Sequence, residues 1–263
     1  MSQVSGRNGR LAEKVCVITG TGSGTGRAAA LRFSREGARI VGCDVSRSAA
    51  LETVGLVQQS GGEMVSLHPC YLTRREDRQG LVDLAVDTYG GIDVLFYNAV
   101  MTRSDSMDVV RDEKWYKAIE YELNLVFLIT RTAWSELAKR SGAIISMTLC
   151  SEWHSCPTLP ALAQTAAKGA IVSLTRRLAL EGRLHGIRAN SISPGPIETN
   201  QACAQFSRPE RFSQILERIM LGRLARPDDV AAAALFLASD ESSFITGADI
   251  CVDGGMAAWG KAA

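Results

Sequence analysis

The chain has 263 residues, 46% of them hydrophobic, which is enough apolar material for a substantial core and excludes a disordered protein. Its 29 basic and 28 acidic residues leave a net charge of +1. This balance gives no electrostatic basis for binding nucleic acid or an anionic membrane, so a small ligand or cofactor is the expected partner.

Targeting signals and cysteine spacing point to the cytoplasm. No apolar run reaches the roughly 20 residues that span a bilayer, and the polar start MSQVSGRNGR lacks the apolar core of a secretory signal. The seven cysteines are scattered singly, without CxxC pairs. We therefore expect a soluble, cytoplasmic protein with reduced, mostly buried thiols and no metal site.

In chain order, strands alternate with helices. After a loose polar arm at 1–12, strands are predicted at 14–19, 37–45, 63–70, 91–99, 143–148, 187–193 and 248–254. Helices are predicted after the glycines at 19–26, at 47–59, 75–89, 111–139 and 160–175, and from Pro227 onward. This alternation predicts an α/β fold, a single Rossmann-like doubly wound domain over 1–263 with a seven-stranded parallel sheet.

The first strand runs directly into the glycine-rich segment TGTGSGTG. Gly20, Gly24 and Gly26 lack Cβ atoms, so the backbone can turn tightly and approach a pyrophosphate at the start of the helix. Asp44 follows about twenty residues later at the end of the second strand, as in dinucleotide sites. Asp44 can accept hydrogen bonds from ribose hydroxyls and would repel a 2′-phosphate, while Ser23 carries no charge to attract one. NAD is therefore expected rather than NADP, with Arg27, Arg39 and Arg47 as alternative phosphate partners.

Several motifs together resemble the short-chain dehydrogenase/reductase family. TGTGSGTG is similar to its TGxxxGxG loop, YNAV (97–100) to its NNAG stretch, and Asn124 in YELNL to its catalytic-helix asparagine. Lys168 is similar to its active-site lysine. RANSISPGPIET (188–199) and the segment 221–255 resemble its later signatures, so the likeness runs in order almost to the C-terminus.

The resemblance implies a role for each matching position. The loop Gly20, Ser23, Gly24, Thr25 and Gly26 would hold the pyrophosphate, and Asp44 would hold the adenosine ribose. The remaining positions would be Leu72 under the adenine, Asn98 beside the adenosine ribose, Lys168 on the nicotinamide ribose, and Pro194, Ile197 and Thr199 around the nicotinamide. Three positions depart from the family: Tyr71 replaces an aspartate, Val100 replaces a glycine, and Tyr97 replaces an asparagine, most simply as a packed aromatic.

The largest departure lies on the predicted helix 160–175. The family places a tyrosine acid one helical turn before its lysine, but this chain has Gln164 four residues before Lys168. An amide can donate a hydrogen bond to a carbonyl oxygen but cannot supply a proton. Ser151 or Thr148 would take the place of the family's serine, and Asn124 that of its asparagine. The proton would come from His154, Tyr121, Lys168 or water.

These patterns favour an NAD-dependent oxidoreductase that acts on a hydroxyl or carbonyl of a small, fairly apolar substrate. A non-redox lyase, dehydratase or isomerase, or a non-catalytic NAD-binding protein, remains an alternative because of Gln164. The resemblance implies a homo-oligomer, commonly a tetramer. The segment 197–223 would form a substrate lid, with an apolar wall made by Phe206, Phe212, Ile215 and Met220.

Overall fold

A seven-stranded parallel sheet forms the centre of the computed structural model, which describes residues 9–99, 106–150, 161–199 and 209–259, with 209–211 described by their backbone alone. The strand order is β3-β2-β1-β4-β5-β6-β7, with every neighbouring pair parallel. The strands are β1 (Val15–Thr19), β2 (Arg39–Cys43), β3 (Glu63–Leu67), β4 (Val94–Tyr97), β5 (Ala143–Met147), β6 (Arg188–Pro194) and β7 (Asp249–Val252). The direction in which successive strands are added reverses between β1 and β4. Ligands of such sheets bind at the carboxyl ends of the strands next to this reversal.

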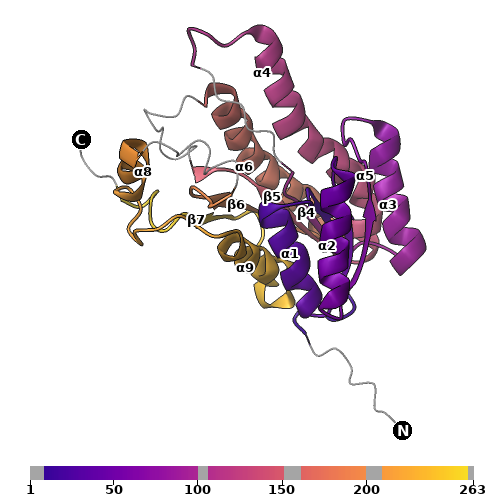
Figure 1. The fold of residues 1–263 in the computed structure, drawn as a ribbon. Helices are drawn as coiled ribbons and strands as arrows, with labels where there is room; N and C mark the ends of the chain where they lie inside the picture. The colour runs from indigo at the N-terminus through magenta and orange to yellow at the C-terminus, as the bar shows by residue number, and fades with distance from the viewer. Residues whose placement is uncertain (1–8, 100–105, 151–160, 200–208, 260–263) are drawn as a thin grey trace.

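Helices cover both faces of the sheet (Figure 1). They are α1 (Gly24–Arg35), α2 (Arg47–Gln59), α3 (Arg75–Tyr89), α4 (Asp112–Ala118), α5 (Leu125–Lys139), α6 (Leu162–Gly182), α8 (Pro209–Leu216) and α9 (Pro227–Ala238). A π-helical segment, η1 (Ile119–Asn124), joins α4 to α5, and short 3-10 turns follow α6 (η3, Arg183–His185) and α9 (η4, Asp240–Ser242).

Two apolar cores lie on opposite faces of the sheet because successive side chains of a strand alternate in direction. In β1, Cys16 and Ile18 face the core that includes residues of α1 and α9. Val15 and Val17 face the core that includes residues of α3, α5 and α6. Burial on both faces explains why these strands read as short continuous apolar runs rather than as alternating patterns. Four of the five cysteines in the described part of the chain are buried, and Cys251 is exposed.

The sequence-based prediction of the sheet is confirmed, and the differences lie among the helices. The predicted helix 111–139 contains the six-residue π-helical segment η1, and the predicted helix 160–175 begins at Leu162 and extends to Gly182. Within 197–223, where no helix was predicted, α8 covers Pro209–Leu216. Among the described residues, no helix is long and apolar enough to cross a bilayer.

Candidate functional site

The glycine loop connects β1 to α1 at the carboxyl edge of the sheet. Gly20 and Gly24 have φ angles of 71° and 51°, a left-handed region that glycine enters without a steric penalty. At Gly26 an added Cβ would lie 2.0 Å from the carbonyl oxygen of Gly20, so the start of α1 packs directly on the turn. Any side chain at position 26 would therefore push the start of α1 away from the turn.

Asn98 and Thr19 hold the loop against the end of β4. The side-chain amide of Asn98 donates hydrogen bonds to the carbonyl oxygens of Thr19 and Gly20, at 3.1 and 3.3 Å. In return, the Thr19 hydroxyl accepts hydrogen bonds from the backbone amides of Asn98 and Ala99, both at 3.0 Å. Asn98 therefore holds the backbone of the glycine loop in place. The sequence predicted Asn98 beside the adenosine ribose and did not predict this contact.

The N-terminus of α1 suits an anionic ligand. The Ser23 side chain makes no capping hydrogen bond to the first turn, and no acidic residue lies in that turn. The uncapped amides of Gly24, Thr25 and Gly26 at the positive end of the helix dipole favour a negatively charged group such as a phosphate. These amides, together with the closed loop behind them, fit the pyrophosphate of a dinucleotide.

Asp44 follows the last residue of β2 and faces the same loop. Its Oδ2 accepts a hydrogen bond from the Gly22 amide at 2.8 Å, and its Oδ1 accepts one from the Ser46 amide at 2.8 Å. A Cβ at Gly22 would lie 2.7 Å from Oδ2, so glycine is needed for this approach. The carboxylate is half-buried and fixed in place, and each oxygen keeps a lone pair for a sugar hydroxyl.

Two arginines considered as phosphate partners are occupied by carboxylates. Arg27 forms a two-pronged ion pair with Glu52, at 2.9 and 2.7 Å, and also donates to the Gly22 carbonyl. Arg39 lies at the opposite end of β2, where it pairs with Glu13 and Glu63. Both guanidinium groups are thus already paired with carboxylates, whereas Arg47, the first residue of α2, is exposed.

The segment after β6 faces the glycine loop from the other side. A Cβ at Gly24 would lie 3.5 Å from the methyl group of Thr199, so the two segments are in near contact. Ile197 is held by an isolated parallel bridge to Ala225, and Pro194, the last residue of β6, is buried. The structure therefore brings one of the three residues predicted around the nicotinamide, Thr199, next to the glycine loop.

Near the predicted adenine position, Leu72 is buried and its carbonyl accepts a hydrogen bond from Arg78 at 2.5 Å. Tyr71, which stands where the family has an aspartate, is exposed, and the guanidinium of Arg74 lies 4.8 Å from its ring centroid. Leu72 is thus part of the apolar core, and Tyr71 contributes no carboxylate.

Gln164 and Lys168 lie one turn apart on α6, and both are buried, with 7% and 1% of their surfaces exposed. The Lys168 ammonium nitrogen lies 2.7 Å from a carboxylate oxygen of Glu122 and donates a hydrogen bond to the Met147 carbonyl at 3.1 Å. Met147 is the last residue of β5, so the lysine is fixed at the carboxyl edge of the sheet.

Glu122, not Asn124, is the residue that faces Lys168 from the preceding helix. Glu122 is completely buried and contacts Lys168, whereas Asn124, the residue predicted at this place, is exposed. Helical periodicity explains the difference, because Glu122 lies three and four residues before the buried Leu125 and Val126. Asn124 is instead three residues before the exposed Phe127. This spacing is evident only in the structure, because the π-helical segment interrupts the regular α-helical count that the sequence alone would suggest.

Tyr97 fixes the π-helical segment that carries Glu122. Its hydroxyl donates a hydrogen bond to the Tyr121 carbonyl at 2.9 Å, and its ring is buried, as expected of a packed aromatic. Burial, with a smaller contribution from the Glu122 charge, raises the pKa of the Tyr97 phenol. Single π turns inside α-helices occur frequently at functional sites.

Of the two candidates for the family's serine, Thr148 is engaged in the wall of the sheet. Its hydroxyl donates a hydrogen bond to the Ile192 carbonyl at 2.9 Å and lies 2.6 Å from the Ser193 hydroxyl oxygen. Ser193 in turn donates to Asp249 at 2.6 Å. Ser151 and His154 lie outside the described residues, as does Val100.

Part of the predicted lid packs over the end of β5. Ile215 and Ile219 are buried in a small cluster with Cys150 and Met256, while Phe212 and Met220 are exposed. Of the four residues predicted to form an apolar wall, Ile215 is thus buried and Phe212 and Met220 are exposed, while Phe206 lies outside the described residues.

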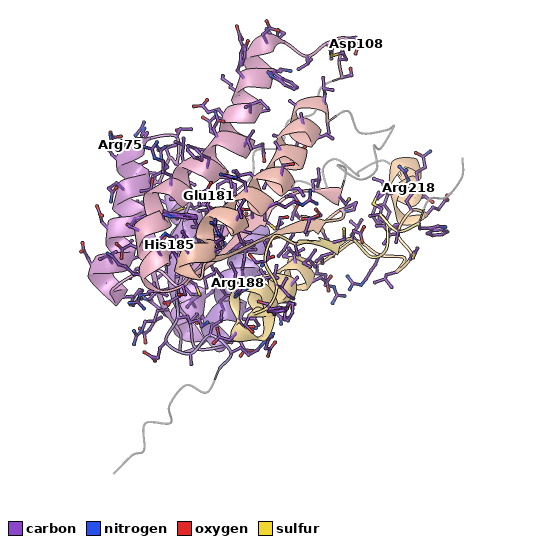
Figure 2. All side chains as sticks on the ribbon, turned by 180° about the vertical axis from the view of Figure 1, so that it is seen from behind. Arg75, Asp108, Glu181, His185, Arg188 and Arg218 are labelled. Carbon is purple, nitrogen blue, oxygen red and sulfur yellow. The ribbon has the colours of Figure 1, made fainter. Side chains whose placement is uncertain are left out.

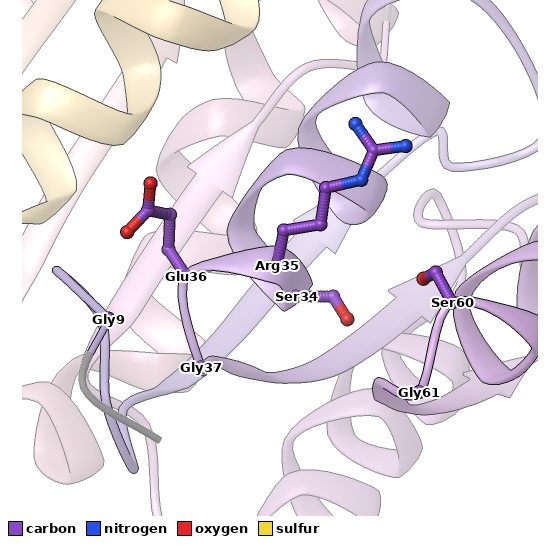
Figure 3. A pocket seen from close by; sticks show the side chains of 7 residues that line it. All are labelled: Gly9, Ser34, Arg35, Glu36, Gly37, Ser60 and Gly61. Atoms are coloured by element: carbon purple, nitrogen blue, oxygen red, sulfur yellow. The ribbon is translucent and has the colours of Figure 1, made fainter.

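A shallow cavity of about 300 Å³ lies at the opposite edge of the sheet, between the end of α1 and the end of α2 (Figure 3). Its lining is mostly backbone and small polar side chains, from Gly9, Ser34, Arg35, Glu36, Gly37, Ser60 and Gly61. No predicted site residue within the described ranges lines it. His185 and Arg188, at the amino end of β6, also lie far from Asp108 near the tip of α4 (Figure 2).

Comparison with known proteins covers nearly the whole chain. A family profile described as Enoyl-(Acyl carrier protein) reductase matches residues 20–257. The chain is 36% identical to the 3-oxoacyl-(acyl-carrier-protein) reductase of Thermotoga maritima, over 94% of this chain and 99% of that protein. It is 35% identical to the meso-2,3-butanediol dehydrogenase of Serratia marcescens, over 95% of this chain and 96% of that protein.

Solved structures agree. A short-chain type dehydrogenase/reductase from Mycobacterium marinum superposes with a TM-score of 0.88 at 28% identity, over 94% of this chain and 96% of that one. The crystal structure of gox2181 gives a TM-score of 0.91 at 28% identity, over 95% and 98%.

Proposed function

Because the chain belongs to the short-chain dehydrogenase/reductase family of oxidoreductases, we propose that it moves hydride between NAD and a hydroxyl or carbonyl group of a small, fairly apolar substrate. The family uses nicotinamide cofactors, and the choice of NAD over NADP rests on one observation. The Asp44 carboxylate is fixed by two backbone amides beside the glycine loop, where a 2′-phosphate would meet its negative charge.

The residues of this chain suggest how the reaction centre is arranged. The uncapped start of α1 binds the pyrophosphate, Asp44 accepts hydrogen bonds from the adenosine ribose, and Thr199 lies across the loop. When bound, the nicotinamide supplies or accepts the hydride. Gln164 donates a hydrogen bond to the substrate oxygen, which polarises a carbonyl without giving up a proton.

The substrate class follows from the relatives and from the lid. The names of the relatives specify a 3-oxoacyl reductase and a butanediol dehydrogenase, whose substrates carry a carbonyl or hydroxyl group. The cluster of Ile215 and Ile219 over the end of β5 supports an apolar wall in the segment 197–223.

Cofactor choice can be tested directly. Titration of the purified protein with NAD, NADH, NADP and NADPH in a calorimeter, followed by absorbance assays at 340 nm on a panel of alcohols and ketones, is expected to show NAD binding and NAD-linked turnover. Tighter binding of NADP than of NAD would refute the NAD assignment. NAD binding without turnover of any alcohol or ketone would refute the redox assignment.

The substitution Gln164→Tyr distinguishes between two hypotheses: an oxidoreductase with an altered active site, and an enzyme that catalyses a different reaction on the same scaffold. Restoring a phenol one turn before Lys168 is expected to raise dehydrogenase activity, because a positioned acid contributes about 10²- to 10⁴-fold to such reactions. An unchanged rate would favour different substrate chemistry. Gln164→Phe, which adds the ring without the hydroxyl, is the matched control.

We also propose that the protein is a homo-oligomer, as the family resemblance implies. Exposed apolar side chains on the long helices support this, including Phe127 on α5 and Leu180 on α6, which are 47% and 49% exposed. Light scattering coupled to size-exclusion chromatography is expected to give a dimer or tetramer. A monomer at micromolar concentration would exclude stable self-association.

A further inference from the structure

Arg78 is a charged exception on the buried face of α3. The buried residues of this helix are Arg78, Leu81, Val82 and Ala85, which recur at the three- and four-residue spacing of one helix face. Arginine is rarely buried without a partner, yet only 7% of Arg78 is exposed. None of the ion pairs among the described residues includes it. A buried cation without a carboxylate costs stability, so a role beyond packing is expected.

The guanidinium of Arg78 holds the chain just before α3. Its Nη1 donates a hydrogen bond to the carbonyl oxygen of Leu72 at 2.5 Å. Its Nε is buried and has no hydrogen-bond partner among the described residues. The charge of Arg78 is therefore directed at a backbone carbonyl rather than at a carboxylate, and the contact fixes the position of Leu72.

The preceding residue of α3, Asp77, holds the same short segment from its other end. Oδ2 of Asp77 accepts a hydrogen bond from the backbone amide of Tyr71 at 2.6 Å. Two adjacent side chains of opposite charge thus bind the N–H of Tyr71 and the C=O of Leu72. Hydrogen bonds to charged groups are stronger than those between neutral groups, so the segment Tyr71–Leu72 is held in one conformation.

This segment lies beside Asp44, which we propose to bind the adenosine ribose. The amide of Cys70 donates a hydrogen bond to the carbonyl oxygen of Asp44 at 2.9 Å, and β3, which leads into the segment, is the edge strand next to β2. A dinucleotide with its pyrophosphate at the β1–α1 loop and its ribose at the end of β2 would place its base further outward, after β3. There Tyr71, which is 42% exposed, offers an aromatic surface on which a base can stack.

We propose that Arg78 and Asp77 are positioning residues for the adenosine end of the dinucleotide site, where they fix the segment Tyr71–Leu72 as the wall against which the base packs. This inference rests on the proposed dinucleotide-binding function. Arg78 acts from the buried side of the segment and Asp77 through the Tyr71 amide, so both act through the backbone of the wall. Loss of either contact loosens the wall and weakens binding of the adenosine half of the ligand.

The opposite charges of the two residues separate positioning from electrostatics. A dinucleotide is an anion, so a purely electrostatic effect would make the loss of Arg78 weaken binding and the loss of Asp77 strengthen it. Positioning predicts weaker binding in both cases. The two variants therefore test the inference by the sign of their effects as well as by their size.

The first test measures binding of two ligands to the wild type, Arg78→Met and Asp77→Ala. ADP-ribose carries the adenosine half, whereas nicotinamide mononucleotide lacks it. Both variants are expected to bind ADP-ribose about 10-fold more weakly by calorimetry. Binding of nicotinamide mononucleotide, followed by NMR titration, is expected to stay unchanged. Arg78→Lys keeps one donor and is expected to recover part of the loss. Asp77 is only partly buried, so its variant preserves the core and keeps the test available if Arg78→Met does not fold.

Matched controls remove the same charges from the same helical turn. Arg75→Met and Glu76→Ala each eliminate an exposed charged side chain at the start of α3 and are expected to leave the binding of both ligands unchanged. A kinetic readout completes the comparison. In Arg78→Met and Asp77→Ala the KM for NAD is expected to rise by a larger factor than kcat falls, because hydride transfer takes place at the other end of the dinucleotide.

The two proposals fail in different ways. Wild-type protein that binds neither NAD nor ADP-ribose would overturn the dinucleotide function and, with it, this inference. Wild-type binding combined with unchanged ADP-ribose affinity in Arg78→Met and Asp77→Ala would overturn the positioning role alone. Opposite changes in the two variants, or equal losses for ADP-ribose and nicotinamide mononucleotide, would also overturn it, as effects of charge or of general stability. Weaker ADP-ribose binding in both variants, absent from the controls, would support the inference.

Discussion

The amide of Gly22 donates a hydrogen bond of 2.8 Å to Oδ2 of Asp44, which ties the glycine loop to the end of β2. The two residues are far apart in the chain and meet because β1 and β2 are parallel neighbours. The contact aims a fixed carboxylate at the mouth of the predicted dinucleotide site.

Asp44→Asn should weaken NAD binding and reduce the preference for NAD over NADP. The asparagine lacks the negative charge that repels a 2′-phosphate. It also accepts weaker hydrogen bonds from the ribose hydroxyls, because a hydrogen bond to a charged acceptor contributes about 1.5–3 kcal/mol. We expect roughly 10- to 100-fold weaker NAD binding by calorimetry. Asp87→Asn, on the exposed surface of α3, is the control, and an unchanged ratio of NAD to NADP affinities would contradict the assignment.

Gly26→Ala should damage the loop and abolish dinucleotide binding. The new Cβ would lie 2.0 Å from the Gly20 carbonyl oxygen, so the start of α1 must move away, at a cost of about 1–3 kcal/mol in the free energy of unfolding. Gly55→Ala in α2 meets nothing within 4 Å and is expected to be neutral or to stabilise by about 0.5–1 kcal/mol. Urea denaturation and NAD titration of both variants check this, and equal behaviour of the two would refute it.

Lys168→Met should destabilise the protein by about 3–5 kcal/mol, because the carboxylate of Glu122 would stay buried without its partner. The double variant Lys168→Met with Glu122→Leu removes both charges and is expected to recover most of that loss. Urea unfolding of the wild type, both single variants and the double variant gives the coupling free energy. Additive losses would show that the pair does not interact.

Asp228→Asn should lower stability at neutral pH but not in acid. The hydrogen-bonded pair with Arg32, which links the start of α9 to α1, lowers the pKa of the Asp228 carboxyl below its ordinary value of 3.8. A carboxyl with a lowered pKa stabilises the fold above pH 3.8 and loses this effect as the pH falls through its folded pKa. The pair is largely exposed, so the difference should be only about 0.2–1 kcal/mol at pH 7 and vanish near pH 2. Thermal melts of both proteins at these pH values measure it, and a constant difference would contradict the mechanism.

Local patterns were enough to predict the sheet and the tight glycine turn between β1 and α1. The glycines of the loop, the apolar runs of the strands and Asp44 at a strand end each express a requirement of the local backbone, which the sequence states directly. The pairing of Gln164 with Lys168 on one buried face also followed from helical spacing alone.

The partner of Lys168 was decided only by the tertiary structure. Glu122 and Asn124 are two positions apart in the sequence, and both lie in the π-helical segment. The regular spacing of an α-helix therefore does not tell which of them faces α6. Which of them faces the lysine depends on how that segment packs against α6 and on the hydrogen bond from Tyr97 to the Tyr121 carbonyl. Sequence alone thus determined the fold, the glycine loop and the absence of a tyrosine before Lys168. Packing between elements distant in the chain determined that a buried carboxylate stands next to that lysine.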